Sequence, residues 1–318
     1  MPPITIHSSH VHDPMRGIAL KLVSVMFFGL MALCVKLLDG TYPTSEIVFA
    51  RSLFALLPLL PLLWLAGSQV LYTRRPLGHL LRGLIGLSAM FTTFYVIPKL
   101  PLATFTTISF TMPLFVAVLA AFVLREHLNR HKLAAVLIGF AGILLVLRPG
   151  AGLADPASLL ALLTAFLVAI IAILIRQLTA TENSLSIVLW FTLLCTLLSG
   201  SMTLFEYIPP SMHDGLLMAG SGLFGGLGQV LLTQSYRYGQ VSILTALEYT
   251  GLLWAVLFDY LFWREVPDFM TLLGASVIIG SGLYILHQAR TTQSPAPTPH
   301  TPPHTPPHTP SSAQSKTC

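Results

Sequence analysis

The stretch VSILTALEYTGLLWAVLFDYLFW (residues 241–263) is apolar almost throughout, although it contains Glu248 and Asp259. It is longer than the ~20 residues that a helix needs to cross the hydrocarbon core of a bilayer. Membrane-spanning strands are about 10 residues long and alternate strictly in polarity, and this stretch does not. It therefore predicts a membrane-spanning helix that carries carboxylates where charge is unfavourable.

The composition of the whole chain agrees with this interpretation. Of its 318 residues, 54% are hydrophobic and 9% are charged, and the mean hydropathy is +0.77. Soluble domains contain about 25% charged residues, so lipid must be the main solvent of this chain. The sequence predicts an all-α integral membrane protein with ten transmembrane helices. They are expected at about 17–38, 46–67, 80–97, 102–124, 132–148, 157–176, 184–206, 215–236, 240–262 and 269–288.

The basic residues between these spans indicate the orientation of the chain, because cytoplasmic loops are enriched in Lys and Arg. With the N-terminus in the cytoplasm, twelve such residues fall on the cytoplasmic side and three (Lys99, Arg148 and Arg264) on the opposite side. We therefore expect a multi-pass protein of the cell inner membrane with both termini cytoplasmic. The formal net charge of +5 then reflects topology and not a nucleic-acid partner.

An internal repeat divides the chain. VLREHLNRHKLAAVLIGFAG (123–142) resembles FWREVPDFMTLLGASVIIGS (262–281), and an Arg-Glu pair stands at the same place in both. Each half would contain five helices, and an odd number inverts the second half across the membrane, as in many secondary transporters. Chance similarity between Leu-rich segments is the alternative. The predicted parts are an N-terminal tail (1–16), two five-helix repeats (17–148 and 149–290) and a tail (291–318).

The C-terminal tail has a different character from the rest of the chain. It is rich in proline and contains a repeated His-Thr-Pro-Pro motif without apolar periodicity, which predicts a disordered, partly polyproline-II segment. Three histidines recur every four residues, at His300, His304 and His308. Weak metal binding by this tail is one interpretation, and a neutral low-complexity extension is the favoured one.

Motifs for enzyme and ATPase chemistry are absent from the sequence. There is no GxxxxGK[ST] phosphate loop, no HExxH motif and no Ser-His-Asp arrangement. Cys34 and Cys195 lie in apolar runs and are expected to be buried small hydrophobic residues. We therefore expect a protein that is not an enzyme and has no metal site or cofactor.

The order of these features resembles a known family. Residues 74–128 contain a basic loop, a span that ends near a tyrosine, a tight turn, a proline in the next span and a closing glutamate, and 236–285 repeats this unit. Because these features occur in this order, the chain is similar to the EamA-type transporters of the drug/metabolite transporter superfamily, over about residues 17–288. The resemblance implies secondary transport. One departure is that Pro113 corresponds to Leu252, so the second half lacks the proline kink.

Glu248 is the leading candidate for a transport site. An ionisable residue deep in a span generally faces water or a partner, and Glu248 lies about 12 Å into its helix at 1.5 Å per residue. Tyr249 and Trp254 could add a polar edge and an aromatic wall for a cationic or zwitterionic ligand. The structural alternative is a buried carboxylate that is protonated or paired with a cation such as Arg51.

Other polar residues have both a functional and a structural interpretation. Arg51, with Glu46 at the mouth of the same span, could meet a substrate carboxylate, or Arg51 could snorkel to the interface. Tyr95 is more typical of an interfacial aromatic belt, and Gln229 of helix–helix hydrogen bonding. Lys36 is expected to snorkel or pair at the end of the first span.

The sequence thus favours a secondary transporter of a small polar or amphipathic metabolite. Export of an amino-acid-like compound, such as a metal-chelating metallophore, is the leading hypothesis, with protons as a candidate coupling ion and a homodimer as a candidate assembly. The alternative is import of S-adenosylmethionine, riboflavin or a similar metabolite. A membrane-embedded enzyme or an assembly protein is the alternative from another class.

Overall fold

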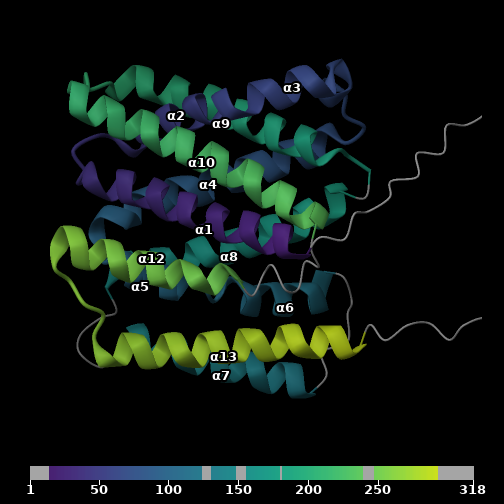
Figure 1. Ribbon diagram of the computed structural model, residues 1–318, viewed down its shortest axis with the longest axis vertical. Helices are drawn as coiled ribbons and strands as arrows, with labels where there is room; N and C mark the ends of the chain where they lie inside the picture. The colour runs from purple at the N-terminus through teal and green to yellow at the C-terminus, as the bar shows by residue number, and fades with distance from the viewer. Residues whose placement is uncertain (1–13, 124–129, 148–154, 180, 239–246, 293–318) are drawn as a thin grey trace, which may run out of the picture.

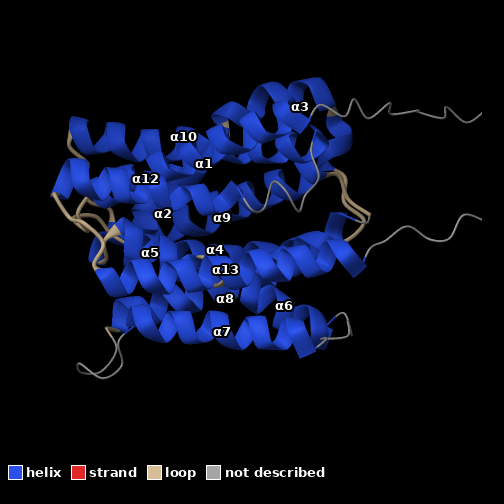
Figure 2. Ribbon diagram, turned by 60° about the horizontal axis from the view of Figure 1, so that its bottom comes forward, coloured by secondary structure: helices blue, strands red, loops and turns tan. Residues whose placement is uncertain are grey.

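In a computed structural model, residues 14–123, 130–147, 155–179, 181–238 and 247–292 are described. Every regular element in these ranges is helical, and the helices run roughly side by side (Figure 1; Figure 2). The first half contains α1 (Pro14–Leu37), α2 (Thr44–Ala55), η1 (Leu57–Leu59), α3 (Leu60–Ala66), η2 (Ser68–Leu71), α4 (Pro76–Val96), η3 (Ile97–Lys99), α5 (Leu102–Ser109), α6 (Met112–Val123) and α7 (Arg130–Leu147). The second half contains α8 (Pro156–Thr179), α9 (Ser184–Glu206), α10 (Met212–Tyr238), η4 (Leu247–Thr250), α12 (Gly251–Phe258), the π-helical turn η5 (Asp259–Trp263) and α13 (Phe269–Thr292).

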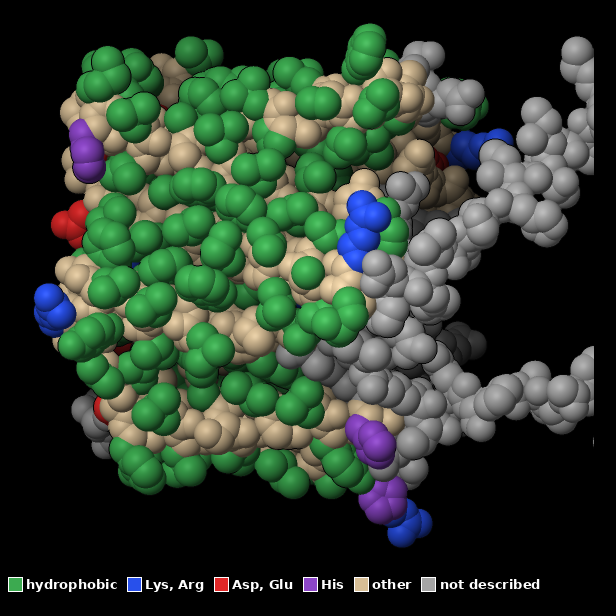
Figure 3. Space-filling model, viewed as in Figure 1, with side chains coloured by type: hydrophobic (Ala, Val, Ile, Leu, Met, Phe, Trp, Pro, Cys, Tyr) green, Lys and Arg blue, Asp and Glu red, His purple; other side chains and the backbone are tan. Residues whose placement is uncertain are grey.

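The outer surface suits a lipid environment. Hydrophobic side chains cover most of the face drawn in Figure 3, and the visible charged side chains lie toward the two ends of the helices. Seven helical stretches in the described ranges are long and apolar enough to cross a membrane, and Leu133–Leu147 and Phe269–Ile285 are shorter apolar helices. The chain is therefore an integral membrane protein that crosses the bilayer several times.

Small residues allow the helices to approach closely. A Cβ on Gly222 would lie 2.8 Å from the carbonyl oxygen of Arg51, and one on Gly226 would lie 3.0 Å from that of Ala55. The GxxxG spacing on α10 therefore packs directly against the backbone of α2, the usual role of this spacing in membranes. Cys34 and Cys195 are buried free thiols, as predicted.

The fourth predicted span is interrupted. Helix α5 ends at Ser109 and α6 begins at Met112, so that Pro113 lies in the first turn of α6, where its missing N–H needs no acceptor. The hydroxyl of Thr111 donates to the carbonyl of Ile108 at 2.7 Å and stabilises the break.

The ninth predicted span is irregular as well, although it has no proline at the position that corresponds to Pro113, and the absence of a kink from this half stays a prediction. A 3-10 turn, η4, precedes α12 although Leu252 stands where the first half has proline. The hydroxyl of Thr250 donates to the carbonyl of Leu247 at 2.6 Å, which is the same contact as in the first half. A threonine that bonds back to the preceding turn, and not proline, is thus the feature common to both irregular helices.

Candidate functional site

Glu248 forms an ion pair with a lysine of the first helix. Its Oε1 lies 2.7 Å from Nζ of Lys21, and the side chain of Lys21 is 2% exposed whereas that of Glu248 is 36% exposed. The structural alternative of a pair between Glu248 and Arg51 is therefore wrong, because the cation beside Glu248 is Lys21. The pair therefore has one buried member, Lys21, and one partly exposed member, Glu248.

The surroundings of Glu248 include the two irregular helices. Glu248 lies on η4, and the next residue, Tyr249, makes an edge-to-face contact with Phe110 at the break between α5 and α6, with ring centroids 4.9 Å apart. The Tyr249 ring also packs against Gly282 of α13, and its hydroxyl has no hydrogen-bond partner. The two interrupted spans thus meet through aromatic rings beside the Lys21–Glu248 pair.

Asp259, the second carboxylate of the same span, has a different setting. Its side chain is 1% exposed, Oδ1 accepts from Nζ of Lys36 at 2.9 Å and from the N–H of Leu102 at 3.0 Å, and Oδ2 accepts from the N–H of Ala103 at 2.7 Å. The last two donors are the first amides of α5, which follow Pro101 and have no side-chain cap of their own. Asp259 therefore caps α5 from another span and complements its dipole.

Arg51 lies in a different part of the bundle from Glu248. It is 8% exposed, and its guanidinium lies beside Gly225 of α10, with Nε 3.2 Å from the position of a Cβ there. Burial between helices favours a contact within the bundle, and the snorkelling alternative for Arg51 stays a prediction. Arg51 nevertheless remains a candidate for contact with an anionic substrate group.

Trp254 is half-buried and packs against the main hydrophobic cluster, whereas Tyr95 lies at the surface. Trp254 lines an apolar groove between α1 and α12 together with Leu22 and Val23, which are themselves exposed to the surroundings of the bundle. The ring of Tyr95 is exposed and lies 3.5 Å from Nζ of Lys99. The placement of Tyr95 favours contact with the interface, and a role in transport stays a prediction for both residues.

Glu46 and Gln229 lie on α2 and α10. Glu46 is 3% exposed, and its Oε2 accepts from the N–H of Ile208, after α9, at 3.1 Å. This contact ties the start of α2 to the connection between α9 and α10. Gln229 is half-buried on α10 and follows Gly228, whose carbonyl accepts from the Ser24 hydroxyl of α1 at 2.7 Å. Among the predicted residues, Glu248 and Tyr249 are neighbours on η4, and Gln229 lies on α10, which packs against the same α1 helix as Glu248.

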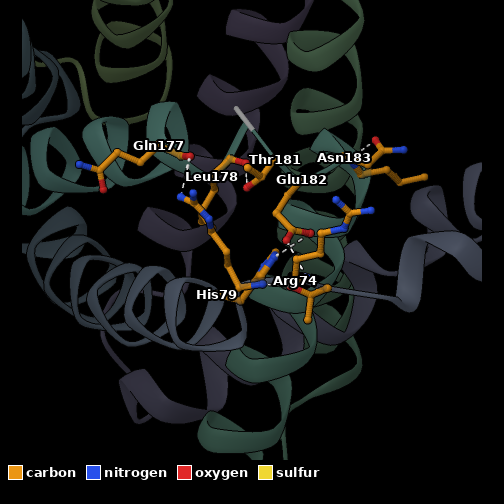
Figure 4. Close-up of polar contacts among 10 residues, drawn as sticks. Arg74, His79, Gln177, Leu178, Thr181, Glu182 and Asn183 are labelled. Atoms are coloured by element: carbon orange, nitrogen blue, oxygen red, sulfur yellow. Dashed lines mark hydrogen bonds and ion pairs between the residues drawn. The ribbon is translucent and has the colours of Figure 1, made fainter.

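A further polar cluster lies where α8 and α9 meet the start of α4 (Figure 4). Oε1 of Glu182 accepts from the N–H of Arg74 at 2.8 Å, and Oε2 lies 3.6 Å from Nε2 of His79. Burial raises the pKa of Glu182, but the Arg74 N–H, the Thr73 hydroxyl and His79 outweigh it and hold the pKa below its ordinary value. The cluster fastens one loop to another and contains no residue from the predicted site.

The sequence interpretation missed Lys21 and Arg82 as site residues. Lys21 was counted as a cytoplasmic loop charge, yet its position inside the first apolar run signalled a partner within the bundle. Arg82 was likewise assigned to a loop, and it is 7% exposed in α4. The pair Arg125-Glu126 and the histidine tail lie outside the described residues.

The sequence matches a family of transporters, and the fold matches a solved structure. The EamA-like transporter family profile matches residues 15–148 and again 155–286. A solved structure, described only as a crystal structure of protein, superposes with a TM-score of 0.62 at 20% identity, covering 87% of this chain and 99% of its own. At that identity the likeness concerns the fold alone.

Three relatives illustrate the range of proteins that this chain is similar to. An S-adenosylmethionine uptake transporter of Rickettsia prowazekii (strain Madrid E) is 26% identical, over 88% of this chain and 95% of the relative. The pseudopaline exporter CntI of Pseudomonas aeruginosa (strain UCBPP-PA14) is 29% identical, over 83% and 93%. An uncharacterized transporter of Helicobacter pylori (strain ATCC 700392 / 26695) is 30% identical, over 85% and 94%. The chain is thus a membrane transporter and belongs to the EamA-like transporter family of the drug/metabolite transporter superfamily.

Proposed function

We propose that this protein is a secondary transporter that moves a small polar or amphipathic metabolite across the bacterial inner membrane by alternating access. The observation that carries the proposal is the half-exposed ion pair between Glu248 and Lys21, which joins α1 to the irregular turn η4. In this proposal two inverted five-helix halves (17–148 and 149–290) rock against one another, both termini are cytoplasmic, and the protein is not an enzyme.

The packing of α7 against α13 supports the inverted repeat. A Cβ on Gly139 would contact Ser281, and one on Gly142 would contact Ile278. At the repeat offset of 139 residues, Gly139 corresponds to Ile278 and Gly142 corresponds to Ser281. The Gly139–Ser281 contact is therefore the counterpart of the Gly142–Ile278 contact. As the residue number rises along α7 it falls along α13, so the equivalent helices run in opposite directions. The double match of the family profile supports the same division.

The ion pair supplies a way to couple a ligand to movement. A ligand shifts a conformational equilibrium only if it interacts differently with the two states. A proton on Glu248, or a cationic group of the substrate that replaces Lys21, would remove the attraction between α1 and η4. That change would allow the two helices to separate, whereas the intact pair holds them together. Protons are therefore the proposed coupling ion, and a homodimer stays a candidate assembly.

Export of an amino-acid-like metabolite, such as a metal-chelating metallophore, is the favoured direction and substrate class. The exporter CntI among the relatives supports this choice. Uptake of S-adenosylmethionine is the second candidate, and the Rickettsia relatives favour it. S-Adenosylmethionine joins a carboxylate to cationic groups, so both candidates suit a site that offers charges of both signs.

Comparative metabolomics tests the direction and the substrate. Cells with and without the protein are compared for metabolites in the medium and in the cytosol, and inverted membrane vesicles are then tested for flux of each enriched compound and of S-adenosylmethionine. We expect Glu248→Gln to abolish or uncouple flux while membrane insertion is retained. Glu206→Gln, at the exposed end of α9, is the matched control and should leave flux unchanged. Full flux through Glu248→Gln at every pH would refute the role of the pair.

A further inference from the structure

Two arginines are buried in the bundle away from the Lys21–Glu248 pair. Arg51 of α2 is 8% exposed and Arg82 of α4 is 7% exposed. The helices around them, α2, α4, α9 and α10, lie together in the upper half of Figure 1. Arginine stays protonated in proteins, so both side chains bring positive charge into an apolar interior.

Neither arginine has a carboxylate partner in the part of the chain that the structure describes. Nε of Arg51, and both Nε and one terminal nitrogen of Arg82, are buried without a hydrogen-bond acceptor. The guanidinium of Arg82 stacks on the ring of Phe191 at 4.1 Å, which leaves its N–H groups unsatisfied. Buried charges are normally paired, and breaking such a pair is strongly unfavourable. Two unpaired guanidiniums therefore indicate that an anion from outside the chain completes the site.

The two guanidiniums lie in one part of the bundle. Both border the same hydrophobic cluster: Arg82 stacks on Phe191, Arg51 lies with Met31 beside Gly225, and Phe191 and Met31 both pack against that cluster. Glycines provide the room that they occupy, since a Cβ on Gly225 would press on Arg51 and one on Gly86 would collide with Arg82. No carboxylate is provided within this arrangement, although the chain makes space for both cations.

We infer that Arg51 and Arg82 together bind a carboxylate of the transported metabolite, between α2, α4, α9 and α10. The planar fork of a guanidinium matches a carboxylate with two parallel hydrogen bonds, and two forks can hold both oxygens of one group. This inference rests on the proposed function, because the carboxylate must enter and leave for transport to occur. It narrows the substrate class to metabolites that carry at least one carboxylate.

Anion-dependent stabilisation of the purified full-length protein tests the inference. The apparent Tm is measured in detergent at constant ionic strength with acetate, L-glutamate or inorganic phosphate, against chloride as reference and against neutral acetamide. We expect the carboxylates to raise the Tm, because a ligand that binds only the folded state stabilises it. No shift with any carboxylate, or a shift with phosphate alone, would overturn the assignment.

Substitution of the arginines separates a ligand site from a structural role. Arg51→Met and Arg82→Met should each weaken carboxylate binding by roughly 10- to 100-fold, the loss expected for charged hydrogen bonds. Without the anion, both variants should be at least as stable as the original protein, because an uncompensated buried charge has been removed. Lys99→Met removes an exposed cation and should change neither property. A lower Tm for both arginine variants in anion-free buffer would contradict the inference.

Flux measurements distinguish this inference from the proposed function. If the arginines bind carboxylates but no metabolite moves, transport fails as the function and the anion site remains. If a carboxylate-bearing metabolite is transported normally by both Arg→Met variants, the site fails and transport remains. Arg51→Lys and Arg82→Lys keep the positive charge but lose the planar guanidinium, so they should retain part of the affinity for carboxylates. Partial retention would show that the loss in the methionine variants is not caused by side-chain shape alone.

Discussion

The ninth span carries two carboxylates with opposite settings. Asp259 is 1% exposed and accepts hydrogen bonds from one lysine and two backbone amides. Glu248, eleven residues earlier in the chain, is 36% exposed and is paired with Lys21. Each joins the span to α1, since Lys21 and Lys36 belong to the same helix.

The number and kind of hydrogen-bond partners decide whether a carboxylate makes a fixed contact, as Asp259 does, or an exchangeable one, as we propose for Glu248. Releasing Asp259 would leave two helix-terminal amides without an acceptor and Lys36 with the more distant carboxylate of Glu265, 3.7 Å away, so this contact is expected to persist throughout a transport cycle. Releasing Glu248 leaves the buried ammonium of Lys21 without this partner, but it uncovers no helix-terminal amide, and the carboxylate itself is 36% exposed. The same span is therefore anchored at one end and free to respond at the other.

The largest effect is expected from removal of the anchor. Asp259→Ala leaves Lys36 buried and uncovers the amides of Leu102 and Ala103, which together should destabilise the protein by about 3–5 kcal/mol. The measurement is the monodisperse fraction in detergent and the apparent Tm. Asp39→Asn is the control, because Asp39 is exposed and asparagine tolerates its positive φ of 49°.

A double substitution tests whether the destabilisation arises from the unpaired lysine. Lys36→Met combined with Asp259→Ala should be less destabilising than Asp259→Ala alone, because no buried charge is left without a partner. If the double variant loses as much stability as the sum of the two single ones, the pair is not coupled. The conclusion that Asp259 is fixed by its pair with Lys36 would then be wrong.

The architecture could be predicted from the sequence to a large extent because lipid imposes long apolar helices. Composition and run length were enough for an integral membrane helical protein, and the paired Arg-Glu segments indicated a repeat. The irregular ninth span was not predicted. Proline is visible in a sequence as a helix breaker, whereas a threonine that bonds back to the preceding turn, as Thr250 does, looks the same as any other threonine.

The candidate site was predictable only in part, because pairing depends on how helices are placed together. An intramembrane carboxylate is noticeable in a sequence, so Glu248 could be selected by position alone. Its partner could not, since Lys21 is 227 residues away along the chain. The same limit applies to Arg82, whose place near the start of a span looked like a loop charge until its burial was known.

An intermediate effect on stability is expected from the exchangeable contact. Glu248→Gln should lower the free energy of unfolding by about 1–3 kcal/mol, because the buried Lys21 loses its counter-charge although the glutamine amide oxygen can still accept from its ammonium. The apparent Tm is compared with that of Asp259→Asn, which should fall further. Equal losses for both variants would show that exposure does not distinguish the two carboxylates.

The smallest effect concerns Glu182, a carboxylate outside the spans that also has several donors (Figure 4). Its folded-state pKa lies below the ordinary value of 4.5, so its stabilising contribution is present above about pH 4.5 and is lost as the pH falls through the folded pKa. Glu182→Gln should therefore lower stability at pH 7 by about 1 kcal/mol or less, and the difference should shrink below pH 4.5. Apparent Tm values from pH 7 to pH 4 measure this change. Repeating the comparison in a His79→Gln variant separates the contribution of the His79 imidazole from that of the other donors. A difference as large as that of Asp259→Ala would show that the number of donors, and not burial among the spans, determines how firmly a carboxylate anchors this fold.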